Sequence, residues 1–80
     1  MEAHMSVKVL FFGSIADRLG KRECSLDTDK AMTVSDLVAA VGCSDFEPLL
    51  LAVNREQISD MGLLVQDGDE VALMPPFSGG

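Results

Sequence analysis

Hydrophobic and polar positions alternate at the start of the chain, over residues 6–12. A period of two predicts a β-strand, because successive side chains of a strand point to opposite faces of the sheet. The same alternation over residues 70–74 predicts a last strand, which follows a turn signalled by Asp67 and Gly68. Further extended segments are shorter or less regular, and they cover residues 22–26, 49–53 and 56–59. Most of the secondary structure is therefore expected in one sheet.

One segment instead has the period of an α-helix, over residues 34–41. Its larger apolar side chains fall on one helical face, and they are Val34, Leu37, Val38 and Val41. Thr33 can cap this helix together with Asp36, and Gly42 can end it. The caps and the spacing outweigh the weak strand preference of the valines, so we predict the main helix here.

A shorter helix is expected between the first two strands. The segment from Ser14 to Asp17 has the form of a capping box, and Gly20 can end the helix. Residues 27–30 are predicted to be a polar connection and residues 59–65 to be irregular. The connections are thus short enough for a single compact unit.

The expected order of elements is a strand, a short helix, a strand, the main helix and then two or three strands. One amphipathic helix over one mixed sheet is the most economical packing of these elements, so the fold class is α+β. The ubiquitin-like β-grasp fold has this order. We expect one domain over residues 6–76, an expression leader over residues 1–5 and an extended tail over residues 77–80.

The first and last strands are apolar on both faces. If one face packs under the main helix, the other carries the side chains of Leu10, Phe12, Ala72 and Met74. On neighbouring strands these side chains would form an exposed patch beside the tail, and such patches often mark protein interfaces. Two alternatives stay open: the faces could be assigned in reverse, or residues 56–65 could fold over the patch.

The charge balance narrows the classes of partner. Thirteen acidic residues against six basic ones give a formal net charge of −7. This argues against nucleic acid and against an anionic membrane surface as partners. No apolar run is longer than residues 49–53, which is far shorter than the roughly 20 residues of a membrane helix. Acidic residues expected near the root of the tail suit a basic partner surface instead, and they are Asp67, Asp69 and Glu70.

Few side chains suit catalysis or metal binding. The only histidine, His4, lies in the expected leader, and the chain has no Tyr and no Trp. A self-contained Ser–His–Asp triad, Cys–His pair or His-ligated zinc site is therefore excluded. Cys24 and Cys43 lack the spacing of a metal or redox pair and suit a reducing cytoplasm. We expect a cytoplasmic protein that binds no metal or cofactor and is not catalytic alone.

The tail is the candidate reactive segment. Pro75 and Pro76 end the last strand, and the chain closes on a Phe-Ser-Gly-Gly sequence at residues 77–80. Terminal glycines lose much backbone entropy on ordering, but they leave a carboxylate that can enter a narrow channel. Gly-Gly alone is a weak signal, whereas Gly-Gly behind the last strand of a β-grasp pattern is a strong one.

The terminal carboxylate of Gly80 is inert until it is activated, most simply as an acyl adenylate formed with ATP. Displacement of AMP then gives an isopeptide or thioester link, or a terminal thiocarboxylate. The chain lacks a Gly-rich phosphate-binding loop. A partner enzyme is therefore expected to use the ATP.

Several segments closely resemble the small subunit of molybdopterin synthase, a ubiquitin-like sulfur carrier. They are residues 7–13, residues 52–54 and the run from Asp67 to Gly80. The resemblance is weakest between Cys24 and Pro48. The combination of Asp-Gly-Asp-Glu-Val with Pro-Pro-x-x-Gly-Gly is specific to this family among β-grasp carriers, and thiamine-pathway carriers generally lack the Pro-Pro.

The resemblance implies a reaction path for Gly80. A ubiquitin-activating-like adenylyltransferase would adenylate it, and a sulfurtransferase system would convert it to a thiocarboxylate. The tail would then enter the large subunit of molybdopterin synthase, within a heterotetramer, and supply sulfur to cyclic pyranopterin monophosphate to form molybdopterin. The partner-binding residues would be Gly79, Ser78, Phe77, Met74, Phe12 and Leu10. The family commonly has an aromatic residue in place of Met74 and a small or β-branched one in place of Phe77.

Rival functions stay open at this point. The activated Gly80 could be passed to a lysine, as in a ubiquitin-like protein modifier, or could serve a thiamine-type sulfur carrier. The chain could also be a plain β-grasp interaction module whose Gly-Gly ending is accidental. The sequence does not separate the carrier from the modifier, because both use the same activated carboxylate.

Overall fold

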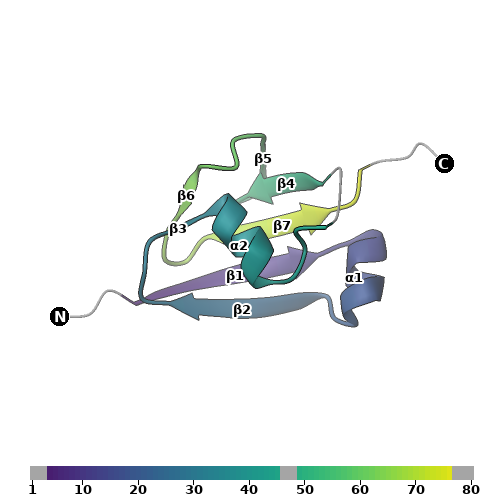
Figure 1. Ribbon diagram of the computed structural model, residues 1–80, viewed down its shortest axis with the longest axis horizontal. Helices are drawn as coiled ribbons and strands as arrows, with labels where there is room; N and C mark the ends of the chain where they lie inside the picture. Colours follow the sequence, from purple (N-terminus) through teal and green to yellow (C-terminus); the bar gives the residue numbers. More distant parts are fainter. Residues whose placement is uncertain (1–3, 46–48, 77–80) are drawn as a thin grey trace.

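Five strands form one mixed sheet in the computed structural model, which describes residues 4–45 and 49–76. The strands are β1 (Met5–Phe11), β2 (Glu23–Thr28), β4 (Leu50–Val53), β5 (Glu56–Ile58) and β7 (Glu70–Met74). Their spatial order is β2–β1–β7–β4–β5, with β1 parallel to β7 and the other neighbours antiparallel. The two strands that are apolar on both faces thus lie side by side inside the sheet (Figure 1).

Helix α2 (Val34–Ala40) lies across one face of this sheet (Figure 1). The predicted capping box is confirmed: the Asp36 backbone N–H donates to Thr33 Oγ1 at 3.1 Å, and the Thr33 N–H donates to Asp36 Oδ2 at 3.0 Å. The helix buries Val34, Leu37 and Val38. Its apolar face therefore covers the sheet, as the spacing predicts.

Helix α1 (Gly13–Leu19) begins differently from the prediction. The capping box at Ser14 is wrong, since Ser14 lies inside the helix and the N-cap is Phe12, which makes no side-chain cap hydrogen bond. A contact with the sheet decides where the helix begins. The Phe12 N–H donates to the Leu73 carbonyl of β7 at 3.1 Å, so the backbone stays extended through Phe12 and the helix starts at the next residue. The predicted end is confirmed, because Gly20 has a left-handed backbone and donates to the Ala16 carbonyl at 2.8 Å.

The segment predicted to be irregular contains strand β6 (Leu64–Val65), which pairs with β3 (Met32–Thr33). Strands of two residues are too short to show alternation in the sequence. The same segment binds the start of α2, since the Val34 N–H donates to the Leu63 carbonyl at 2.8 Å and the Ser35 N–H to the Met61 carbonyl at 2.9 Å. It therefore satisfies backbone donors that a helix N-terminus leaves open. Part of the predicted 27–30 connection also belongs to a strand, because β2 runs to Thr28.

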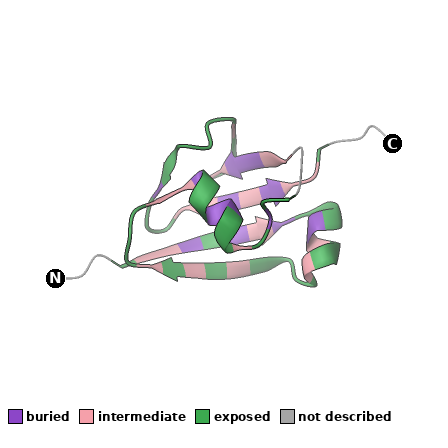
Figure 2. Ribbon diagram, in the orientation of Figure 1, coloured by how far each residue is buried: buried purple, intermediate pink, exposed green. Residues whose placement is uncertain are grey.

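The buried residues of the strands and helices form one hydrophobic core, and they are coloured purple in Figure 2. Its buried members are Val7, Val9, Phe11, Ile15, Val34, Leu37, Val38, Cys43, Leu51, Val65, Val71 and Leu73. The inward faces of β1 and β7 are thus the ones expected under the main helix, and the reverse assignment is excluded. The architecture is the ubiquitin-like β-grasp, an α+β fold. No helix in the described ranges is long and apolar enough to cross a membrane.

We predict that Thr33→Ala lowers the free energy of unfolding by about 1 kcal/mol, because it removes the acceptor for an N–H of the first turn of α2. Urea denaturation measures the change. Ser35→Ala is the matched control, since Ser35 is an exposed residue of the same turn. Equal stability of the two variants would show that the capping box does not stabilise the fold.

Candidate functional site

An apolar hollow of about 450 Å³ lies on the sheet face opposite α2. It is lined by Leu10, Phe12, Ala52, Arg55, Gln57, Glu70, Ala72 and Met74. The register of the sheet explains the grouping, because Leu10 of β1 and Ala52 of β4 both pair with Ala72 of β7. Side chains of one row therefore point to the same face on three neighbouring strands.

The lining is open to solvent at the residues singled out from the sequence. Phe12 is 47% exposed, and Leu10, Ala72 and Met74 are half-buried. Residues 56–65 do not cover these side chains, since β5 lies beside β4 at the edge of the sheet and β6 pairs with β3. The structure thus brings Leu10, Phe12 and Met74 together around one hollow. Their role in partner binding stays a prediction.

The other end of the apolar hollow is polar. Arg55 and Gln57 are exposed there, and Arg55 Nε lies 4.0 Å from Glu70 Oε1. The turn beside it is fixed by Asn54, whose Oδ1 accepts from the Glu70 N–H at 3.0 Å and whose Nδ2 donates to Asp69 Oδ1 at 3.0 Å. The backbone from which the Arg55 side chain projects is therefore held in place at the rim.

Two acidic residues expected near the root of the tail lie elsewhere. Asp67 and Asp69 precede β7, at the end of that strand opposite to Pro75. Asp67 Oδ1 accepts from the Ser6 N–H at 2.8 Å, and Asp69 Oδ2 accepts from the Gln66 N–H at 2.8 Å. These carboxylates close turns, so the expectation that they lie beside the tail for a basic partner is wrong. Glu70 alone of the three lines the hollow.

The root of the tail is packed against the start of α1. A Cβ built on Gly13 would lie 2.9 Å from Pro75 Cγ, and Gly13 has a φ of +58°. Only glycine fits this close approach without displacing the proline. The chain after β7 is therefore held beside the end of β1. The predicted reactive and binding residues Phe77, Ser78, Gly79 and Gly80 lie outside the described residues.

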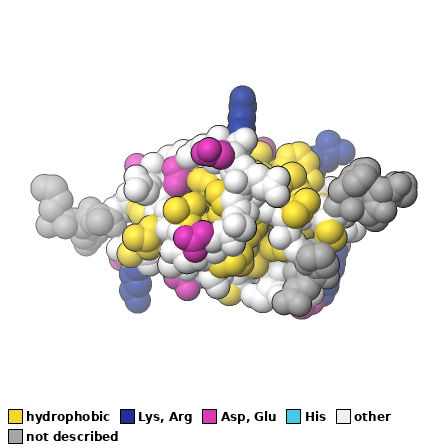
Figure 3. All heavy atoms as spheres, turned by 90° about the horizontal axis from the view of Figure 1, so that it is seen from above, with side chains coloured by type: hydrophobic (Ala, Val, Ile, Leu, Met, Phe, Trp, Pro, Cys, Tyr) yellow, Lys and Arg dark blue, Asp and Glu magenta, His cyan; other side chains and the backbone are white. Residues whose placement is uncertain are grey.

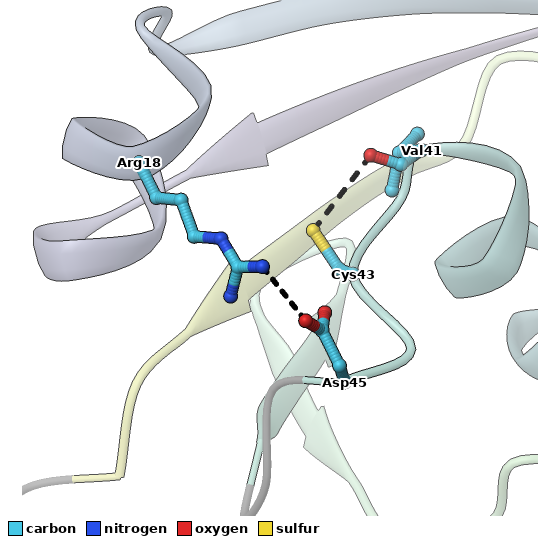
Figure 4. A network of polar contacts seen from close by, with 4 residues as sticks. All are labelled: Arg18, Val41, Cys43 and Asp45. Atoms are coloured by element: carbon cyan, nitrogen blue, oxygen red, sulfur yellow. Dashed lines mark hydrogen bonds and ion pairs between the residues drawn. The ribbon is translucent and has the colours of Figure 1, made fainter.

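A polar contact joins α1 to the loop after α2 (Figure 4). Arg18 donates to Asp45 Oδ2 at 2.7 Å, and this hydrogen bond holds the pKa of the Asp45 carboxyl below its usual value. Cys43 lies next to it, where burial raises the pKa of the thiol and Sγ donates to the Val41 carbonyl at 3.9 Å. A thiol with a raised pKa is a poor nucleophile, so Cys43 serves as a buried core residue and not as a reactive thiol.

No group of three or more metal-ligating side chains occurs in the part of the chain that the structure describes. Cys24 and Cys43 are both free thiols. Other large apolar side chains are exposed at Met61, Leu63 and Leu64. Leu64 belongs to β6, and Met61 and Leu63 precede it. Figure 3 shows the molecule from above, and apolar side chains are exposed on that face too. None of the three lines the apolar hollow.

The fold and the site together define a ubiquitin-like β-grasp protein with an apolar hollow beside the strand that leads to its carboxyl terminus. The chain belongs to the ThiS family, and the match covers residues 9–80. Over an alignment of 83 residues it is 32% identical to a molybdopterin synthase sulfur carrier subunit of Drosophila yakuba. That alignment covers 95% of this chain and 92% of the relative.

Solved structures that are similar over nearly the whole chain include the following two. The crystal structure of small archaeal modifier protein 1 from Haloferax volcanii has a TM-score of 0.77 at 31% identity, covering 94% of this chain and 99% of that one. Subunits 1 and 2 of the molybdopterin-converting factor of Helicobacter pylori were solved as a protein–protein complex. The matched chain has a TM-score of 0.67 at 26% identity, covering 95% of this chain and all (100%) of that one.

We predict that Gly13→Ala destabilises the fold by about 2–3 kcal/mol, because it adds overpacking against Pro75 to left-handed backbone strain. Gly20→Ala is the matched control, since Gly20 has a φ of +73° and a Cβ there would meet nothing within 4 Å. The control should lose only the strain, about 1 kcal/mol. If urea denaturation shows the same loss of unfolding free energy in both variants, Pro75 moves aside at no cost and the close approach does not matter.

Proposed function

We propose that this chain is the sulfur carrier of a molybdopterin synthase. The observation that carries the proposal is the identity of 32% to a relative of that name over nearly the full length of both chains. The family match also runs through Gly80, so it includes the Gly-Gly ending. The reactive group is the terminal carboxylate, and the domain serves as the part that partners recognise.

The proposed reaction begins with activation of the terminal carboxylate of Gly80. A ubiquitin-activating-like adenylyltransferase uses ATP to form the Gly80 acyl adenylate, and pyrophosphate leaves. A sulfur nucleophile supplied by a sulfurtransferase system displaces AMP and leaves a terminal thiocarboxylate. In the large subunit of molybdopterin synthase, the thiocarboxylate gives its sulfur to cyclic pyranopterin monophosphate, and hydrolysis by water restores the Gly80 carboxylate. The family assembly would be a heterotetramer, with the carrier binding no cofactor of its own.

The apolar hollow supports the docking part of this proposal. Phe12 and Met74 stand on its rim at the end of the sheet from which the tail departs, and Phe12 is the most exposed of its larger apolar side chains. A subunit 1 and subunit 2 complex has been solved for the Helicobacter pylori relative. The two free thiols in the described ranges suit a reducing compartment such as the cytoplasm.

A protein modifier is the second candidate. The similarity to small archaeal modifier protein 1, at 31% identity, favours it. In that function the activated Gly80 acylates a lysine amine instead of receiving sulfur. The two candidates share the adenylate, so the fate of the carboxylate distinguishes them.

We predict that deleting Gly80 reduces molybdopterin formation to background in a reconstituted system of carrier, adenylyltransferase, sulfur donor and large subunit. The melting temperature should change by less than about 2 °C, because terminal residues contribute little to stability and the core ends at Leu73. Full sulfur transfer by the shortened chain would contradict the proposal.

Intact mass spectrometry of carrier purified with its pathway provides the direct test. One terminal oxygen should be replaced by sulfur in the wild type and not in the variant that lacks Gly80. A ladder of lysine conjugates on blots against the chain, with no thiocarboxylate, would favour the modifier. If removal of the tail changes neither partner binding nor molybdopterin formation, the chain is a plain interaction module.

We predict that Phe12→Asp weakens binding to the large subunit about 30-fold or more, as expected when a charge replaces an aromatic side chain that the partner buries. The fold should survive, because Phe12 is the N-cap of α1 in an extended conformation and Asp is a favoured N-cap residue. Leu64→Asp is the matched control, since Leu64 is 56% exposed and lies outside the hollow. Melting of Phe12→Asp, or equal weakening by the control, would count against the hollow as the docking site.

A further inference from the structure

Arg55 occupies a backbone conformation that favours glycine. Asn54 and Arg55 form the turn between β4 and β5, with φ values of 53° and 71°. Two-residue hairpin turns with positive φ at both positions typically carry Asn followed by Gly. Asn54 suits the turn both by residue type and by its two side-chain hydrogen bonds to Asp69 and Glu70. The fold therefore accounts for the first residue of the turn.

The fold does not account for the second residue in the same way. The Arg55 side chain is 90% exposed, and its ion pair with Glu70 spans 4.0 Å. An exposed pair at that distance contributes little to stability. Arginine at this position thus strains the backbone and gives the fold little in return. Residues held in strained conformations cluster at binding and active sites.

The position of Arg55 indicates what its guanidinium could bind. It lines the polar end of the apolar hollow, whose other end is formed by Leu10, Phe12 and Met74. A guanidinium presents a planar fork of donors that matches a carboxylate or a phosphate. The net charge of −7 disfavours a nucleic acid as the source of that anion. A carboxylate on a docking protein is therefore the complementary group.

We propose that Arg55 is a specificity-determining residue of the apolar hollow and pairs with a carboxylate of the protein that docks there. An apolar side chain of the same partner enters between Leu10, Phe12 and Met74. The inference rests on the proposed function, in which this partner is the large subunit of molybdopterin synthase. Arg55 then selects a partner with an acidic residue beside its apolar anchor, and it repels one with a basic residue at that point.

The experiment compares Arg55→Gly with the wild type for stability and for binding to the large subunit from the same organism. Arg55→Gly should raise the melting temperature by about 4 °C, because glycine relieves the backbone strain. It should weaken binding about tenfold in isothermal titration calorimetry at low salt. The loss should shrink at about 1 M salt, where the Debye length falls to about 3 Å.

Two further variants separate the guanidinium from general charge. Arg55→Lys keeps a cation and the strain, so it should bind more tightly than Arg55→Gly while remaining weaker than the wild type. Lys30→Ala removes a cation from an exposed position that does not line the hollow, and its affinity should match the wild type. Far-UV circular dichroism of each variant checks that the fold is retained.

The outcomes are distinct. Unchanged affinity of Arg55→Gly, or equal losses in Arg55→Gly and Lys30→Ala, would overturn the role of Arg55 while leaving the proposed function intact. Failure of the wild type itself to bind the large subunit would overturn the proposed function and this inference with it. A selective loss in Arg55→Gly that salt suppresses would support the carboxylate pair.

Discussion

The parallel pairing of β1 with β7 is the contact on which the rest of the structure depends. It joins Lys8 to Glu70 and Phe11 to Leu73, residues at opposite ends of the chain. Both strands are apolar on both faces, so the pairing creates two apolar surfaces at once. One surface closes the core under α2. The other becomes the apolar hollow, because no element of the described chain covers it.

The same pairing sets the root of the tail. The last hydrogen bond between these two segments runs from the Phe12 N–H to the Leu73 carbonyl. It brings Gly13, the first residue of α1, against Pro75, the residue that follows β7. A proline has a fixed φ and no N–H, so a contact at this point restrains the chain where it leaves the sheet. The residue that follows β7 is therefore held beside the start of α1 by the absence of a side chain at Gly13.

The parts that sequence patterns predicted well are those whose signals are local. The bounds of β7 and the capping box of α2 follow from alternation and from residue types a few positions apart. The pairing of β1 with β7 was only a condition in the sequence analysis, which described the patch that would form if the two strands were neighbours, and the structure shows that they are. The apolar lining of the hollow could be predicted because the outward faces of these two strands are apolar in the sequence.

The errors share a different cause. Ser14 has the residue type of a cap, but a hydrogen bond from Phe12 to β7 decides where α1 begins. Strands β3 and β6 have only two residues each, so no periodicity marks them. Asp69 was assigned to partner binding from its charge, whereas its oxygens are taken by Asn54 and Gln66. The Asp-Gly-Asp turn signal could have suggested that role, because Asp side chains commonly bind nearby backbone N–H groups.

The net charge of the molecule and the charge of a local surface act over different distances, and they need not have the same sign. The net charge of −7 is spread over the chain and acts at long range, where it influences encounter with charged partners and disfavours nucleic acid. If a partner docks on the hollow as proposed, the side chains that line it are the ones close enough to choose between partners. Two of these are charged, Glu70 and the highly exposed Arg55. A protein that is acidic overall can therefore present a cation beside an apolar hollow, and the total charge does not reveal which group that hollow would select.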